Sequence, residues 1–216
     1  MNVIKDVFRE KVNIFEIIKL LFGGKWGKTK MNEDMKKVFS DFKLYKKVDE
    51  NIIDKYKDIV GKDVVEIWEK YGFGSTFNGY FKIINPDDYQ ELLEETYIMP
   101  FDDIPVFITG MGDIITCNSR GSFTILDYRH QRLEILWTGK EIEWNYFIDE
   151  DYNEEYFQWD PYFEAVEKYG EPEYNECFGY EPLLSLGGKE NIENLKKMNV
   201  EVHITIMGEI QGILSC

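Results

Sequence analysis

The first third of the chain repeats its apolar residues at the spacing of a helix. One stripe ends at Gly23 and Gly24 and predicts an amphipathic helix near the N-terminus; its members are Val7, Phe8, Val12, Phe15, Ile18 and Phe22. The segment that follows, GGKWGKTK, is typical of a flexible connector. Apolar residues at helical spacing then predict three further helices, in residues 32–42, 52–60 and 64–71.

The period changes after residue 72 to one that favours strands. Residues 77–84 contain an Asn-Gly pair among β-forming residues and predict a hairpin or the entry to a strand. A helix is predicted over 86–97, with Asn85 as its N-cap and Pro86 at its first position. Strand-like runs separated by turn signals then predict an antiparallel meander; they occupy residues 104–110, 113–118, 122–129, 132–139 and 142–148.

The last third mixes both kinds of pattern. Asp160 as N-cap, Pro161 and a closing Gly170 predict a helix over 160–170. A short helix near 190–198 and a strand over 200–207 follow. We therefore expect an α+β fold, mainly an antiparallel sheet with helices packed on it, and a helical N-terminal region. A chain of 216 residues with 44% hydrophobic residues can bury a large core.

Charge divides the chain at about residue 30. Residues 1–30 hold seven basic and three acidic residues, a net charge of +4, so the total of −16 leaves −20 on residues 31–216. We expect residues 1–30 to be a basic amphipathic helix with its connector and residues 31–216 to be a single α+β domain. The basic helix has two interpretations: it contacts a membrane surface or acidic partner, or it packs on the acidic body of its own chain.

The acidic balance limits the possible partners. Binding nucleic acid directly requires cations that neutralise phosphates, so we expect none here, and a basic protein partner fits better. Cys117, Cys177 and Cys216 form no CxxC pair, which favours a reducing compartment. Charges interrupt the apolar N-terminal segment too often for a signal peptide or membrane span. We expect a cytoplasmic protein.

Residues that would indicate catalysis are scarce. The chain has two histidines, of which His203 is expected on a strand at a sheet face and His130 in a surface turn. Sequence motifs of serine hydrolases, zinc proteases, nucleotide-binding loops and dinucleotide-binding folds are missing. Carboxylate pairs such as Asp102-Asp103 leave a metal-dependent hydrolase open, but in so acidic a chain they arise by chance. We expect no enzyme, no cofactor and no metal.

The most unusual stretch is Glu141 to Glu176. It holds 13 acids against Lys168 alone, a charge of −12, and it is interleaved with aromatic residues. Carboxylates would steer a basic partner and exposed aromatic rings would anchor it; the alternative is that the rings face the core and the acids are solvated. The candidate partner-binding residues are Asp149, Glu150, Asp151, Glu154, Glu155, Trp159 and Asp160.

Several strings of residues resemble one known family. The runs are residues 68–95, 104–117 and ECFGYEPLLSLGG at 176–188, followed by the ending VHITIMGEIQGIL. Together they resemble the GAD-like family, which includes the C-terminal domain of immunity proteins against type VI secretion DNase toxins. The resemblance covers about residues 60–215. The motif residues, which we expect to be structural, are Glu176, Cys177, Gly179, Pro182, Gly187 and Gly188.

The resemblance implies a role rather than an active site. It suggests an immunity protein that binds and neutralises a cognate bacterial toxin, a basic nuclease, through the acidic aromatic-rich surface. Two other classes of function stay open beside the metal-dependent hydrolase: a non-catalytic regulatory or scaffold module for another basic protein, and a peripheral membrane protein that uses residues 1–30.

Overall fold

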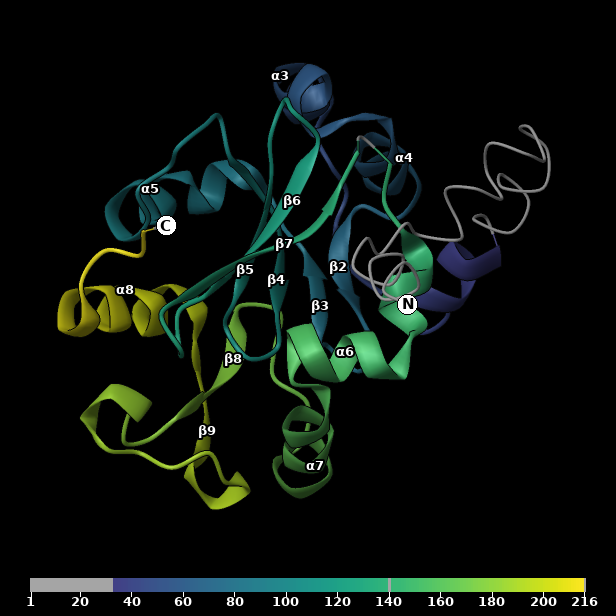
Figure 1. Ribbon diagram of the computed structural model, residues 1–216. Coiled ribbons are helices and arrows are strands. Elements are labelled where there is room, and N and C mark those ends of the chain that lie inside the picture. The colour runs from purple at the N-terminus through teal and green to yellow at the C-terminus, as the bar shows by residue number, and fades with distance from the viewer. Residues whose placement is uncertain (1–32, 140, 216) are drawn as a thin grey trace, which may run out of the picture.

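The computed structural model describes residues 33–139 and 141–215. Within them, the centre of the protein is a seven-stranded sheet in which each strand pairs antiparallel with the next one along the chain (Figure 1). The strands are β1 (Lys43–Lys46), β2 (Phe73–Thr76), β3 (Phe81–Ile83), β4 (Ile104–Thr109), β5 (Ile114–Cys117), β6 (Ser122–Asp127) and β7 (Arg132–Thr138).

Both faces of the central strands of this sheet are buried. Successive side chains of a strand point to opposite faces. Phe107 and Ile115 accordingly join one core, while their neighbours Ile108 and Ile114 join the other. Because every residue of β4 and β5 is buried, these strands are mainly apolar instead of alternating with polar residues, and Thr109 and Thr116 are their only polar members.

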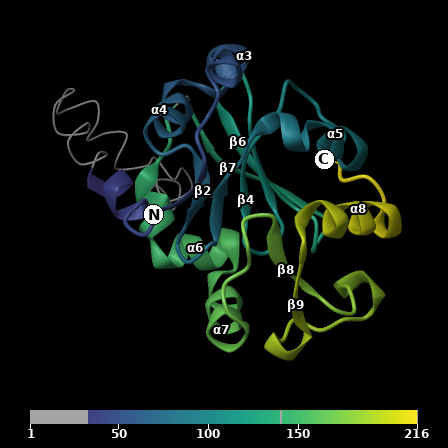
Figure 2. The ribbon, with the colours of Figure 1, turned by 180° about the vertical axis from the view of Figure 1, so that it is seen from behind.

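Different helices cover the two faces (Figures 1 and 2). One core packs against α5 (Pro86–Thr96) and α8 (Val200–Gln211), through residues such as Leu93 and Ile204. The larger, aromatic-rich core on the other face packs against a greater number of elements: α3 (Glu50–Val60), α4 (Lys62–Lys70), the 3-10 helix η1 (Trp144–Ile148), α6 (Glu150–Phe157) and α7 (Trp159–Tyr169).

A two-stranded antiparallel sheet lies beside the main one. It consists of β8 (Glu176–Tyr180) and β9 (Leu195–Asn199), connected through two short 3-10 helices, η2 (Leu184–Leu186) and η3 (Ile192–Asn194). The Phe178 amide donates to the Gly110 carbonyl at 2.7 Å, which fixes β8 to the turn between β4 and β5. Asn199 then caps α8 by accepting the Val202 amide.

Much of the predicted architecture is confirmed. The structure is an α+β fold built on an antiparallel meander, and helices occupy residues 33–38, 50–60, 62–70 and 86–96. Asn85 is the N-cap of α5, as expected, and its side chain accepts the Asp87 amide. The Asn-Gly pair forms the β2–β3 turn, in which Asn78 has a φ of 51°. The helix predicted in the first 30 residues lies outside the described residues.

Two predicted strands are wrong. In place of a strand over 142–148, residues 144–148 form η1, in which Trp144 and Phe147 are buried three positions apart, so the apparent alternation hid a helical spacing. Residues 200–207 belong to α8, where the buried positions are Val200, His203, Ile204 and Met207. The β-branched residues there suggested a strand, but the Asn199 cap and packing against α5 favour a helix.

Smaller predictions also need correction. The helix expected near 190–198 is a single 3-10 turn followed by β9. Helix α7 begins at Trp159, so Asp160 lies in its first turn, and Gln158 precedes the helix instead of Asp160. The patterns did not predict β1, β8 or α6.

A buried ion pair joins distant parts of the fold. The Arg129 guanidinium donates to both oxygens of Asp113, at 3.2 and 2.8 Å, and to the Gln158 amide oxygen at 3.1 Å. Exposure of the two charged side chains is only 3% and 0%. Burial alone would lower the Arg129 pKa, but the neighbouring carboxylates raise it overall, so Arg129 stays charged.

A second polar cluster lies at the turn between β6 and β7. His130 Nδ1 lies 2.7 Å from Asp127 Oδ2, and its Nε2 lies 3.0 Å from Glu190 on the loop between β8 and β9. Arg132 also donates to Asp127. His130 was expected to be a surface residue, but its side chain is 22% exposed and bridges two carboxylates. The hydrogen bond to Asp127 is the main cause of its raised pKa.

Replacing Arg129 with methionine leaves the buried Asp113 carboxylate without a cation. Removing one partner of a buried pair costs about 3–5 kcal/mol, so we expect Arg129→Met to lower the free energy of unfolding by that amount at pH 7. Urea unfolding measures it. The double variant Asp113→Asn/Arg129→Met removes both charges and should recover part of the loss; equal losses in the single and double variants would contradict the assignment.

The His130 contacts should make stability depend on pH. Because folding raises the His130 pKa, its stabilisation is complete below the unfolded pKa and is lost as pH rises through the folded one. We expect His130→Asn to be less stable than the parent by about 1 kcal/mol at pH 6 and by less at pH 8.5. Urea titrations across this range measure the difference, and one that does not change with pH would refute this assignment.

Candidate interaction surfaces

The acidic stretch forms a helix that its own carboxylates help to start. Asp149 is the N-cap of α6 and accepts the Tyr152 amide at 2.9 Å. Glu150 and Asp151 follow in the first turn, where the helix dipole stabilises negative charge. The acids of this stretch therefore favour the helix locally, although the sequence patterns did not predict it.

All the acids predicted to bind a partner are exposed: Asp149, Glu150, Asp151, Glu154, Glu155 and Asp160. Hydrogen bonds occupy some of them, since Glu154 accepts the Asp160 amide at 3.5 Å. Among the described residues, none of the six forms a salt bridge with a lysine, arginine or histidine. No cation within residues 33–139 and 141–215 therefore neutralises their charge through a salt bridge. We call these six residues the α6 acidic surface.

Trp159 and most aromatic residues of the stretch serve the core rather than the surface. Trp159 is half-buried, and its ring centroid lies 5.0 Å from those of Phe77 and Phe163. Phe157 and Tyr162 are fully buried. The acidic part of the predicted surface is therefore exposed, whereas its aromatic part is largely packed inside.

One group of rings does lie beside the acids. Tyr146, Tyr152 and Tyr156 are half-buried and stack in a row, with centroid distances of 4.4 and 4.5 Å. The Tyr152 hydroxyl donates to the Leu136 carbonyl at 2.9 Å, which ties α6 to the edge strand β7. Burial is the main cause of the raised Tyr152 pKa, so this hydroxyl stays neutral.

The family motif occupies a different place, on β8 and the loop after it. Glu176 accepts the Glu173 amide at 3.0 Å, and the carbonyls of both residues accept hydrogen bonds from the buried Lys82 ammonium. Cys177 is fully buried, and burial raises the pKa of its thiol to about 12. A buried neutral thiol is a poor nucleophile, so these residues support the fold.

The glycines of the motif allow close packing. A Cβ at Gly179 would lie 2.6 Å from the His203 ring and from Met198 Sδ, and one at Gly188 would lie 1.9 Å from the Pro182 carbonyl oxygen. Gly187 follows η2 with a φ of 86°, which favours glycine. The structural role expected for these residues stays a prediction.

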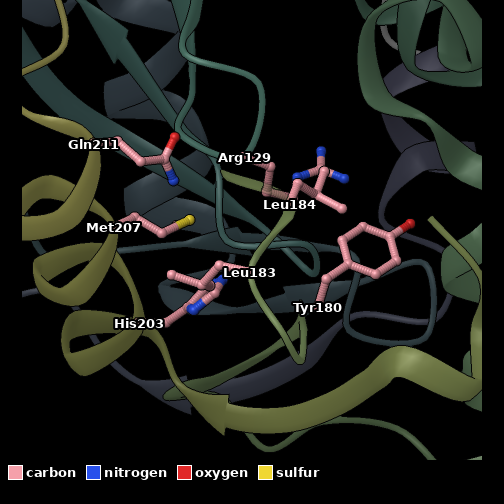
Figure 3. Close-up of a pocket in the computed structure, with 7 residues that line it drawn as sticks. All are labelled: Arg129, Tyr180, Leu183, Leu184, His203, Met207 and Gln211. Carbon is pink, nitrogen blue, oxygen red and sulfur yellow. The ribbon is translucent and has the colours of Figure 1, made fainter. Parts of the chain in front are cut away.

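A small pocket lies between α8 and the loop that contains η2 (Figure 3). Its empty volume is about 180 Å³, and it is lined by Arg129, Tyr180, Leu183, Leu184, His203, Met207 and Gln211. His203 is buried on α8, and its Nε2 has no hydrogen-bond partner among the described residues. Burial, and next the Arg129 charge, lower the His203 pKa to about 4, so the ring is neutral near pH 7.

The described residues contain no set of side chains arranged for metal binding. No group of three or more His, Cys, Asp or Glu residues within 33–139 and 141–215 could hold an ion. None of the helices in this part of the chain is both long and apolar enough to cross a membrane.

Two segments of the chain match known family models. Residues 145–211 match the model described as T6SS immunity protein Tdi1, C-terminal, and residues 30–99 match that of the GAD-like domain. The first segment contains α6 and α8, and the second contains the helices before β4. The GAD-like match begins at residue 30. The expected resemblance began only at about residue 60, so its N-terminal limit was wrong.

A solved structure shows the same fold. It is the crystal structure of Atu4351 from Agrobacterium tumefaciens, with a TM-score of 0.66 and 17% identity; the match covers 83% of this chain and 89% of that one. No curated protein matches this chain significantly in sequence. The predicted resemblance is therefore confirmed in two segments: one is similar to the GAD-like domain, and the other to the C-terminal domain of a type VI secretion immunity protein.

Proposed function

We propose that this chain is a cytoplasmic immunity protein that binds a cognate bacterial toxin and blocks it without catalysing a reaction. The observation that carries the proposal is the match of residues 145–211 to an immunity-protein model. That segment contains most of the stretch with a charge of −12. Family resemblance and electrostatics thus point to the same part of the chain.

The α6 acidic surface is the proposed contact with the toxin. We infer that the toxin is a basic nuclease, because an enzyme that binds a polyanion presents cations around its active site. Exposed carboxylates without a neighbouring cation can take the place of phosphates there. The half-buried tyrosine row beside them, and the accessible part of Trp159, add apolar contact at the edge of this surface.

Co-expression tests the function itself. The toxin to use is the product of a toxin gene adjacent to the gene for this chain. We expect cells that produce the toxin to survive only when they also produce this chain, and the two purified proteins to form a complex. If the adjacent product harms cells equally with and without this chain, the proposal is wrong.

Charge reversal tests the α6 acidic surface. Changing Glu150, Asp151, Glu154 and Glu155 to lysine should weaken toxin binding about tenfold or more at low salt and flatten its salt dependence. Calorimetric titration at several salt concentrations measures both effects. A matched control changes four exposed acids of α3 and α4 to lysine: Glu50, Asp58, Glu66 and Glu69. Equal losses in both variants would indicate dependence on net charge alone and refute this interface.

A further inference from the structure

Exposed apolar side chains concentrate at one end of the fold. The described residues include ten large apolar side chains that are exposed. Five of them lie on or next to α8, with exposures between 41% and 59%: Ile98, Val202, Ile206, Ile210 and Ile213. We call these five residues the α8 apolar face. Contiguous exposed apolar residues of this kind usually mark a binding site.

The geometry of α8 explains why these residues share a face. Val202, Ile206 and Ile210 follow at intervals of four, so they lie above one another along the helix. The opposite side, including Val200 and Ile204, is buried against the sheet. Since the core-facing side of α8 is already packed against the sheet, contacts among the described residues do not account for the second stripe.

Backbone hydrogen bonds hold the rest of the face rigid. After α8 the chain returns to the end of α5, where the Leu214 amide donates to Thr96 and the Ile98 amide donates to Leu214, each at 2.9 Å. These hydrogen bonds fix the backbone on which Ile98 and Ile213 lie. A preformed surface loses little conformational entropy on binding.

The pocket of Figure 3 lies along a different side of α8 from this face, the side that carries His203, Met207 and Gln211. Met207 and Gln211 of α8 form one wall, Leu183 and Leu184 form another, and the nearby Leu186 is 60% exposed. The empty volume of about 180 Å³ includes space open to solvent, and its enclosed part is only about 10 Å³, room for about one water molecule. The pocket is therefore too small to take a ligand or a partner side chain, and the α8 apolar face is the part of this region available for contact.

The charge around the face selects the kind of partner. Helices α5 and α8 contain no lysine or arginine but seven acids: Asp87, Asp88, Glu91, Glu94, Glu95, Glu201 and Glu209. Among the described residues, only Asp87 of these forms a salt bridge, with Lys55. An apolar stripe with an acidic border is complementary to an amphipathic segment with a basic border.

From this complementarity we propose that the α8 apolar face binds a cationic amphipathic helix of the toxin. This inference rests on the proposed function and adds a second contact to it. The two surfaces differ in physical character: binding at the α6 acidic surface is electrostatic and weakens with salt, whereas binding at the α8 apolar face depends on buried area and changes little with salt.

Replacing two residues of the face tests the proposal. We expect Ile206→Ser/Ile210→Ser to weaken binding of the adjacent-gene toxin about tenfold or more, by a similar factor at low and high salt. The control is Ile135→Ser, which changes an equally exposed isoleucine on β7 and should leave affinity unchanged within about twofold. Calorimetric titration measures affinity, and urea unfolding verifies that the variants fold as the parent does.

The outcomes separate the two proposals. If the parent protein does not bind the toxin, the proposed function is wrong and this inference falls with it. If the parent binds and the double variant binds equally well, only the inference is wrong. It is also overturned if toxin affinity is unchanged while the double variant loses dimers that the parent forms, or while the double substitution exposes residues 1–30 to proteolysis, because a second copy or that segment would then be the occupant of the face.

Discussion

The contact between Arg129 and Asp113 links two turns of the main sheet to the junction between α6 and α7. Asp113 lies in the turn between β4 and β5, Arg129 follows β6, and Gln158 separates α6 from α7. Desolvating these charges is costly, so each is stable only with the other in place. Arg129 also donates to Gln158, the residue that follows α6 and has a left-handed φ of 50°. This contact helps to hold the C-terminal end of α6 in place. A buried ion pair thus helps to orient the helix whose exposed acids we assign to toxin binding.

Local signals predicted those elements whose ends are marked by special residues. Asn85 and Pro86 define the start of α5, and an Asn-Gly pair defines the β2–β3 turn, because these residues favour one backbone geometry almost regardless of context. The backbone geometry of residues 200–207, in contrast, depends on contacts with distant residues. Their alternation suggested a strand, and only contacts with the distant α5, together with the Asn199 cap, make a helix. Tertiary packing overrides propensity in such a segment.

The same segment shows why the sequence revealed one candidate surface and concealed the other. Charge is additive along the chain, so the excess of acids between residues 141 and 176 was visible without a structure. Whether Ile206 and Ile210 are core or surface depends on which side of α8 meets the sheet. In a strand, both would have faced the same way as Val202 and Ile204. Interpreted as a helix, the segment places Ile204 inside and Ile206 outside.

The two surfaces lie over opposite faces of the sheet (Figures 1 and 2), and their physics is complementary. Long-range attraction mainly accelerates association, while burial of apolar area mainly slows dissociation. An inhibitor of the proposed nuclease toxin, which must bind it before it reaches nucleic acid, benefits from both. Carboxylates alone would compete poorly with a polyanion present in large excess. An apolar contact that nucleic acid cannot reproduce would therefore supply the selectivity that charge cannot, which is why the exposed isoleucines of α8 matter to the proposed function.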